Sequence, residues 1–394
     1  MNNGSILSLR TLLSLRLCAM SCITALPSLL TAQPALEFSG YVVQFPVYQR
    51  LDAAIAQLSG ISRDQTVDAT RVRLRPSLSW GENSFFMLEH EVSAVYTFNT
   101  LGLLSSPTAA RRQLVDLSWD LTTGSRWFIR HFVDRMYLRT SFSSVEVTVG
   151  RQRIAWGSGR VWNPTDLFNP SSPTSFSKVE KDGADAVVAK TTLGQFSDVT
   201  VVWNPQKDQS ANVGIRARTN FEGYDLAGIA GVFDSRTTFG VDAAGSAFDA
   251  GLRFEMLFSA NMIAFNNNYL RWIFGVDNQF TERLYALFEM QFNGEGRKDK
   301  LRYDIQRLLR GEILNVARHY GTVQASYLIH PLVTVTGSWL QNWTDGSGYY
   351  GGGVQVSMTN EVAGALGIQL FHGGMLTEYW YFPTTVYARA DAYF

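Results

Sequence analysis

The chain ends in nine residues that alternate between two kinds of side chain: Val386-Tyr-Ala-Arg-Ala-Asp-Ala-Tyr-Phe394. Val386 and the alanines at 388, 390 and 392 are apolar, whereas the residues between them are polar or amphipathic. Successive side chains of a β-strand point to opposite faces, so this segment predicts a strand with one face in hydrocarbon and the other in water. An amphipathic edge strand of a soluble sheet would have the same pattern, and the rest of the chain decides between the two.

The same alternation recurs upstream with a strongly charged polar face. Segments 70–78 and 86–96 carry charges at alternate positions, and these charges are Arg71, Arg73, Arg75, Glu89 and Glu91. A hairpin joining the two segments would bring all five charges to one face. Burying them in a soluble core would be prohibitive, whereas a water-filled lumen tolerates them.

Further alternating segments place additional charges opposite apolar rows, and these are Asp116, Asp120, Arg216, Arg218 and Arg253. Weaker stretches with strand character lie near 38–48, 184–193, 196–203, 224–233, 270–280, 319–329 and 362–371. The sequence therefore predicts an all-β protein, a transmembrane antiparallel β-barrel of about 16–18 strands.

The first residues have the layout of a secretory signal peptide. Arg10 and Arg16 lie before an apolar stretch at residues 17–30. Ala32 is a small residue after which the signal could be cleaved, and Ala25 is an alternative cleavage position. We expect residues 1–32 to be the signal peptide and residues 33–394 to form one outer-membrane β-barrel domain in a bacterial cell. Both cysteines, at 18 and 22, fall in the predicted signal.

The composition excludes some classes of partner and favours others. The formal net charge is zero, which argues against nucleic acid, because a nucleic-acid-binding face is usually basic. Aromatic residues make up 13% of the chain, including ten Trp, and Trp and Tyr favour membrane interfaces. Arginine far outnumbers lysine, and its planar guanidinium can be held in carboxylate ladders inside a pore.

Two segments interrupt the alternation. Residues 297–318 carry apolar side chains near 3.6-residue spacing, which predicts an amphipathic helix in an extracellular loop or against the mouth of the barrel. A surface helix without a special role would have the same spacing. The second interruption, near 151–173, contains more unusual residues.

This second segment begins Gly150-Arg-Gln-Arg-Ile-Ala-Trp-Gly-Ser-Gly159 and is unlike a hairpin turn. Asn163 followed by Pro164 predicts a helix cap, and prolines at 170 and 173 would end the helix. We expect the segment to fold inward on Trp156, Trp162 and Phe168 as anchors. Its charged residues would then narrow the lumen and set its charge preference, and they are Arg151, Arg153, Arg160 and Asp166. A loop packed only for barrel stability is the alternative.

The Gly-Arg-Gln-Arg-Ile strand followed by Trp-Gly, with Asp134-Arg135-Met-Tyr137 one strand earlier, resembles bacterial outer-membrane porins of the alginate-export type. This resemblance implies a monomeric or trimeric barrel that passes anionic or weakly apolar solutes along arginines, Arg135 among them. The C-terminal strand ending in Phe394 resembles the export signal of outer-membrane barrels. That likeness implies recognition of residues 386–394 by the barrel-assembly machinery.

Nothing in the sequence indicates catalysis, a metal or a cofactor. The five histidines are not at metal-ligand spacing, and no His-Glu-x-x-His, Gly-x-Ser-x-Gly or phosphate-binding loop is present. Paired carboxylates near a barrel mouth could in principle form a hydrolase site. Carboxylates opposite arginines more commonly belong to neutralised ladders, so we predict that the protein is not an enzyme.

Together these features predict a porin or channel for small, anionic solutes, constricted by the loop near 151–173. The expected partners are outer-membrane lipid, small solutes and, in a homotrimer, copies of this chain. One alternative is a specific transporter for a hydrophobic or polysaccharide ligand, with residues 33–65 plugging the lumen. Another alternative is a structural or assembly barrel.

Overall fold

The computed structural model describes residues 34–98, 112–169, 174, 181–208, 210–263, 267–309 and 313–394. The predicted signal peptide, residues 1–32, lies outside these ranges, as do prolines 170 and 173 of the central loop. Among the described residues, no helix is long and apolar enough to cross a bilayer.

The described residues form nineteen strands in one antiparallel sheet. The strands are β1 (Ala35–Arg50), β2 (Asp64–Trp80), β3 (Ser84–Thr97), β4 (Ser118–Thr123), β5 (Trp127–Phe142), β6 (Val145–Gln152), β7 (Ala184–Thr192), β8 (Asp198–Pro205), β9 (Ala211–Phe221), β10 (Tyr224–Phe233), β11 (Arg236–Ala247), β12 (Ala250–Asn261), β13 (Tyr269–Gln279), β14 (Leu284–Asn293), β15 (His319–His330), β16 (Val333–Asn342), β17 (Gly348–Ser357), β18 (Val362–His372) and β19 (Thr384–Tyr393). Short helical pieces join some of them: α2 (Ala53–Ser59), η3 (Lys300–Arg302), α3 (Ile305–Leu309) and η4 (Glu378–Tyr381).

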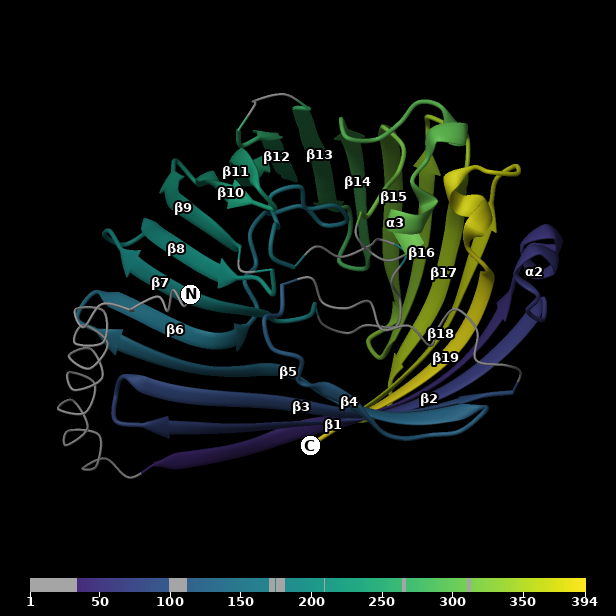
Figure 1. Cartoon of the computed structure of the whole chain (residues 1–394), viewed down its shortest axis with the longest axis horizontal. Coiled ribbons are helices and arrows are strands. Elements are labelled where there is room, and N and C mark those ends of the chain that lie inside the picture. The colour runs from purple at the N-terminus through teal and green to yellow at the C-terminus, as the bar shows by residue number, and fades with distance from the viewer. Residues whose placement is uncertain are drawn as a thin grey trace, which may run out of the picture.

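The sheet closes on itself because β1 pairs with both β2 and β19. At the seam, Gly40 and Phe394 exchange backbone hydrogen bonds of 2.9 and 3.1 Å. The seam joins the two ends of the sheet, and the strands follow one another around the ring (Figure 1). The predicted C-terminal strand is therefore a full member of the wall.

The nineteen strands occupy eighteen positions in the ring, because β4 and β6 share one place in it. One edge of β5 pairs with β3. The opposite edge pairs with β6 over residues 136–142 and with β4 over residues 128–132. The predicted antiparallel barrel of about 16–18 strands is thus confirmed, with eighteen positions around the wall.

The wall is apolar outside and polar inside. In β11, Phe239 and Val241 are 52% and 42% exposed on the outer face, whereas Thr238 and Asp242 are 2% and 7% exposed on the inner face. The same alternation recurs around the ring, where large exposed side chains such as Phe274 and Leu366 occupy the outer face. A closed barrel with this belt is the fold of bacterial outer-membrane proteins, and the chain belongs in that membrane.

The two ends of the barrel differ. Eight connections at one end have two to five residues each, whereas every connection of more than ten residues lies at the opposite end. In outer-membrane barrels the short turns face the periplasm and the long loops face outward. The loops that carry α3 and η4 therefore lie at the extracellular mouth.

The predicted helix over 297–318 is wrong in length. Among the described residues of that range, which leave out 310–312, only η3 and α3 are helical, and the extended backbone at Tyr303 separates them. Contacts with the wall replace helical hydrogen bonds, since the Asn293 side chain donates to the backbone oxygens of Asn315 and Ala317 at 3.2 and 3.1 Å. These tertiary contacts outweigh the helical tendency that the 3.6-residue spacing of apolar side chains predicted.

The proposed plug at 33–65 is also absent from the described part of that range. Residues 35–50 and 64–65 are wall strands, and α2 lies in the connection between them. The backbone of β1 forms hydrogen bonds with β2 along one edge and with β19 along the other. This segment is therefore held in the wall and does not fill the lumen.

A charge on the outer face should destabilise the barrel strongly. We expect Phe274→Arg, near the middle of β13, to lower the free energy of unfolding by about 2–4 kcal/mol, because an arginine must enter hydrocarbon. Reversible urea unfolding in phospholipid vesicles measures this change.

The matched control is Gln355→Arg, since Gln355 lies on the inner face of β17. We expect it to alter the unfolding free energy by only about 0.5 kcal/mol. Equal losses in the two variants would contradict the assignment of faces.

Candidate functional site

The central loop leaves the wall where β6 ends and runs through the interior of the ring (Figure 1). Residues 153–169 of this loop contact the inner faces of strands far away in sequence. The predicted inward-folded loop is therefore present. Its contacts fall into a base at the wall, two carboxylate anchors and two aromatic anchors.

The base of the loop is closed by Arg151. Its guanidinium is buried and makes a bidentate pair with Asp185, with N–O distances of 2.7 and 3.0 Å. It also donates to the backbone oxygens of Val133 and Val115, which lie on β5 and just before β4. Arg151 thus bridges the gap in the wall that opens where the chain turns inward.

The first carboxylate anchor is Glu255 of β12, which is completely buried. Its oxygens accept hydrogen bonds from the backbone N–H groups of Ser158, Gly159 and Thr165 at 2.8, 2.6 and 3.0 Å. The Thr165 hydroxyl adds a fourth bond at 2.6 Å. Gly157 has φ +87°, and a Cβ there would meet the same carboxylate, so glycine is required at this position.

The second carboxylate anchor is Glu289 of β14. It accepts from three consecutive N–H groups, those of Arg160, Val161 and Trp162, at 2.8, 3.2 and 2.7 Å. Successive backbone N–H groups that converge on one point form a nest for an anion. Here the anion is supplied by the wall, so the interaction holds the loop and neutralises a buried charge.

The two aromatic anchors flank these carboxylates. Trp156 packs against Phe168 and Phe233, with ring centroids 5.0 and 6.3 Å apart. Trp162 lies 6.1 Å from Tyr320, and both side chains are buried. The three aromatic residues predicted as anchors are therefore all packed between the loop and the wall.

The predicted helix cap at Asn163 is wrong, because residues 153–169 contain no helical element. Asp166 instead closes a turn, its N–H donating to the Asn163 oxygen at 3.1 Å. The Asn163 amide is used elsewhere, donating to the Gly159 oxygen at 2.8 Å. Asp166 is buried, and its Oδ2 atom lies 2.6 Å from Nζ of Lys181. Burial raises the pKa of Asp166, and the nearby Lys181 ammonium opposes this rise.

The predicted arginine and glutamate hairpin does assemble on the inner face of β2 and β3. Arg73 pairs with Glu89 at 2.8 Å and with Glu91 at 3.5 Å, and it also contacts Asp134 of β5. Further contacts to these glutamates come from Arg71, Arg75 and Arg135. The contribution of Asp134 depends on strand pairing and was not predicted.

The other predicted charges form separate pairs. On the neighbouring part of the wall, Arg216 pairs with Asp242, Arg218 with Asp198, and Arg253 with Asp277. Asp120 makes a bidentate pair with Arg130, at the hairpin of β4 and β5. Asp116 precedes β4, where hydrogen bonds from Ser118 lower the pKa of its carboxyl.

In several of these pairs the cation is the more exposed partner. The side chains of Arg71, Arg75 and Arg218 are 23%, 26% and 42% exposed, whereas their partners Glu91, Glu89 and Asp198 are 5–6% exposed. Arg153 and Arg160 of the loop are also exposed and form no ion pair with a described residue. At these three positions the carboxylate lies beneath its guanidinium partner, whereas Asp120 and Asp185 are more exposed than Arg130 and Arg151.

A buried network joins the loop to the extracellular mouth. Tyr320, which packs on Trp162, donates from its hydroxyl to Glu378 of η4 at 2.5 Å. Asn342 donates to the same carboxylate at 2.9 Å. Burial raises the pKa of Glu378 to about 8, although the hydrogen bond from Tyr320 opposes this rise.

One contact joins two histidines far apart in the sequence. The Nε2 atom of His90 lies 2.8 Å from Nδ1 of His131, and Trp119 packs against the second ring. The spacing of these histidines in the sequence did not indicate the contact, which depends on the pairing of β3 with β5. Among the described residues, no group of three or more His, Cys, Asp or Glu could hold a metal ion.

Solved bacterial structures share this fold, and one of them is named as a porin. OccAB3 of Acinetobacter baumannii is 8% identical, with 91% of this chain and 99% of that chain covered and a TM-score of 0.57. A BenF-like porin of Pseudomonas fluorescens Pf-5 is 10% identical, with 91% and 98% covered and a TM-score of 0.56. No family model and no curated protein sequence matches. The fold is therefore that of a porin-type β-barrel.

Removal of a carboxylate anchor should release the loop. We expect Glu289→Ala to raise single-channel conductance and current noise, because three backbone N–H groups lose their acceptor at a cost of about 1–3 kcal/mol each. Planar-bilayer recording measures both quantities.

Glu289→Gln keeps an acceptor and should have a smaller effect. Glu82→Ala, in an exposed turn between β2 and β3, removes the same side chain far from the loop and serves as the control. Wild-type conductance in Glu289→Ala would contradict the anchoring role.

The mouth network should weaken as the pH rises. The pKa of folded Glu378 is about 8, above its ordinary value of 4.5, so folding favours the protonated carboxyl. The stabilisation is complete below about pH 4.5 and is lost as the pH passes 8. We expect the hydrogen-exchange protection factor of the Tyr379 amide to fall across this range.

In Glu378→Gln the protection factor should not change with pH, because the amide does not titrate. Correction for the intrinsic exchange rate separates the loss of structure from base catalysis. If the protection factor falls equally in the wild type and in Glu378→Gln, a group other than Glu378 causes the pH dependence and the prediction is contradicted.

Proposed function

We propose that this protein is an outer-membrane channel through which small solutes diffuse, with a preference for anions. The observation that carries this proposal is a set of three exposed arginines whose partner carboxylates are buried. A diffusing ion meets Arg71, Arg75 and Arg218 more readily than their acidic partners. An Arg-lined pore favours anions by the field that it creates, without tight binding.

The central loop is proposed as the constriction. Two loop arginines, Arg153 and Arg160, are exposed and carry the charge preference in this account. Other residues of the loop, Trp156 and Asp166 among them, are buried and hold it in place.

A specific transporter remains the second candidate. Its ligand would be a hydrophobic molecule or a polysaccharide. It is supported by the resemblance of residues 134–137 and 150–157 to porins of the alginate-export type, which implies passage of anionic or weakly apolar solutes. Recognition of strand 386–394 by the barrel-assembly machinery and assembly into a homotrimer are further proposals. A structural barrel is less well supported, because the inner wall is mostly polar and carries many charges.

Reversal potentials in a KCl gradient test the charge preference. We expect wild-type protein to pass chloride more readily than potassium. The double variant Arg153→Gln/Arg160→Gln should reduce this permeability ratio by about twofold to fivefold, since two partly screened charges are removed. At about 1 M salt the preference should weaken, because the Debye length falls to about 3 Å.

Arg283→Gln is the matched control, because Arg283 is exposed in a short turn between β13 and β14. It should leave the permeability ratio unchanged. Absence of channel steps from pure protein would contradict the proposed function. Cation preference in a conducting wild type would contradict the anion assignment alone.

A further inference from the structure

One side of the inner wall lacks the charges that line the rest. On this side, the inner-face residues of β15–β18 are all uncharged over four neighbouring stretches. These stretches are residues 322–326, 336–340, 349–353 and 367–371. This surface faces a cavity of about 410 Å³, bounded by β14 and β19 as well. That volume falls within the range of small-molecule sites.

Small side chains form the floor of the cavity. Gly351 pairs with Ser338 and Gly353 with Thr336, so two adjacent strands present hydrogen atoms or hydroxyl groups where larger side chains would fill the space. Gly367 lies beneath the ring of Tyr387, and a Cβ there would displace that ring. Of these positions, Gly351, Thr336 and Ser338 line the cavity, and their small side chains leave its space open.

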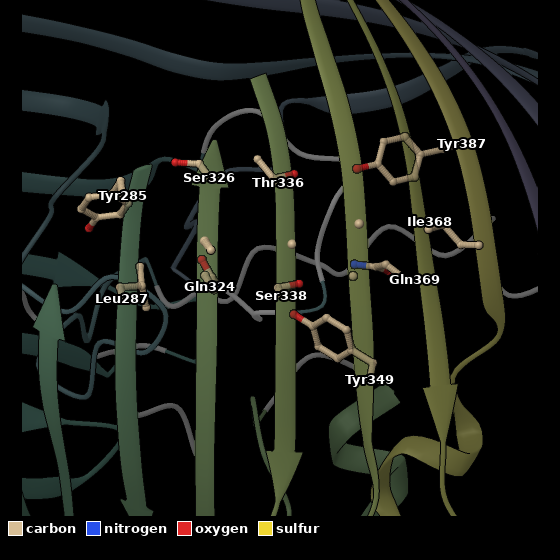
Figure 2. A pocket seen from close by; sticks show the side chains of 14 residues that line it. Tyr285, Leu287, Gln324, Ser326, Thr336, Ser338, Tyr349, Ile368, Gln369 and Tyr387 are labelled. Carbon is tan, nitrogen blue, oxygen red and sulfur yellow. The ribbon is translucent and has the colours of Figure 1, made fainter. Parts of the chain in front are cut away.

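Tyrosine rings and amide groups form its sides. Figure 2 shows Tyr285, Tyr349 and Tyr387 around the cavity, with Gln324 and Gln369 between them. A tyrosine offers a flat apolar face together with a hydroxyl group. A glutamine amide offers two donors and an acceptor without a net charge.

Gln369 supplies the observation that points to a ligand. Its side chain is 8% exposed and lines the cavity, and its buried amide oxygen accepts no hydrogen bond from the described residues. A buried acceptor without a donor is costly. Rotation of the amide by 180° would exchange its oxygen and nitrogen, so that a hydroxyl group of a bound solute could donate to the oxygen.

We propose that this cavity is a binding site for a neutral, ring-shaped polyol, a mono- or disaccharide, within the lumen. Such a solute combines an apolar ring face with many hydroxyl groups, which matches the tyrosine rings and the amides. Charged solutes have no counter-ion on these strands. The inference rests on the water-filled lumen of the proposed channel, but it does not depend on the ion preference.

Sugar block of the channel current tests the site. In planar bilayers we expect maltose to reduce the current saturably, whereas sorbitol, a polyol without a ring, should lower it only as far as it lowers bulk conductivity. Gln369→Leu and Tyr387→Leu should each raise the half-blocking maltose concentration about tenfold, because each loses one principal contact.

Gln355→Leu is the matched control, since Gln355 lies on the inner face of β17 but outside the cavity lining. Its half-blocking concentration should equal that of the wild type. Equal block by maltose and sorbitol, or equal block in wild type and Gln369→Leu, would overturn the proposal.

Calorimetry separates this site from the channel function. The purified barrel is titrated with maltose in a detergent that has no sugar headgroup. Saturable heat in the wild type and weaker binding in Gln369→Leu would support the site even if no current steps are seen, in which case only the channel function fails. Current steps without maltose binding in the titration would overturn the site alone.

Discussion

The structure depends on one constraint: backbone groups in hydrocarbon must find hydrogen-bond partners within the protein. The pairing of β1 with β19 meets this constraint at the last open edge, where Gly40 and Phe394 exchange hydrogen bonds. Once the ring is closed, each strand has a lipid face and a water face. The alternating sequence, the outer apolar belt and the inner layer of charges all follow from that closure.

The central loop creates a local problem for this wall. A chain that turns inward after Gln152 leaves β6 short, and the β5 edge beyond it would lack a partner. Strand β4 pairs with that edge, and Arg151 bridges the junction through Asp185 and the Val115 oxygen. The loop itself is then held by carboxylates of the opposite wall. Barrel integrity and the position of the loop are therefore coupled through a few buried charges.

Sequence patterns could predict those features that depend on neighbouring residues. The period-two strands, the charged hairpin face and the aromatic residues of the loop were all predictable, whereas β11, rich in Ala and Gly, carried too weak an alternation to be named. Contacts between distant segments were not predictable. Glu255 and Glu289 hold a loop that lies 96 and 127 residues upstream of them, respectively. The short helices near Tyr303 reflect packing at the mouth of the barrel.

Spin-label accessibility along β18 tests the central claim most directly, because both native cysteines lie in the predicted signal peptide. Single labels at positions 365, 366, 368, 369 and 370 would be compared for collision with oxygen, which concentrates in lipid, and with a water-soluble nickel chelate. Gly367 is left out because a Cβ there would displace the Tyr387 ring. We expect oxygen to be favoured at Leu366, Ile368 and Leu370, and nickel at Ala365 and Gln369. Shielding of those three positions from both reagents would show them packed against protein and contradict a lipid-facing barrel.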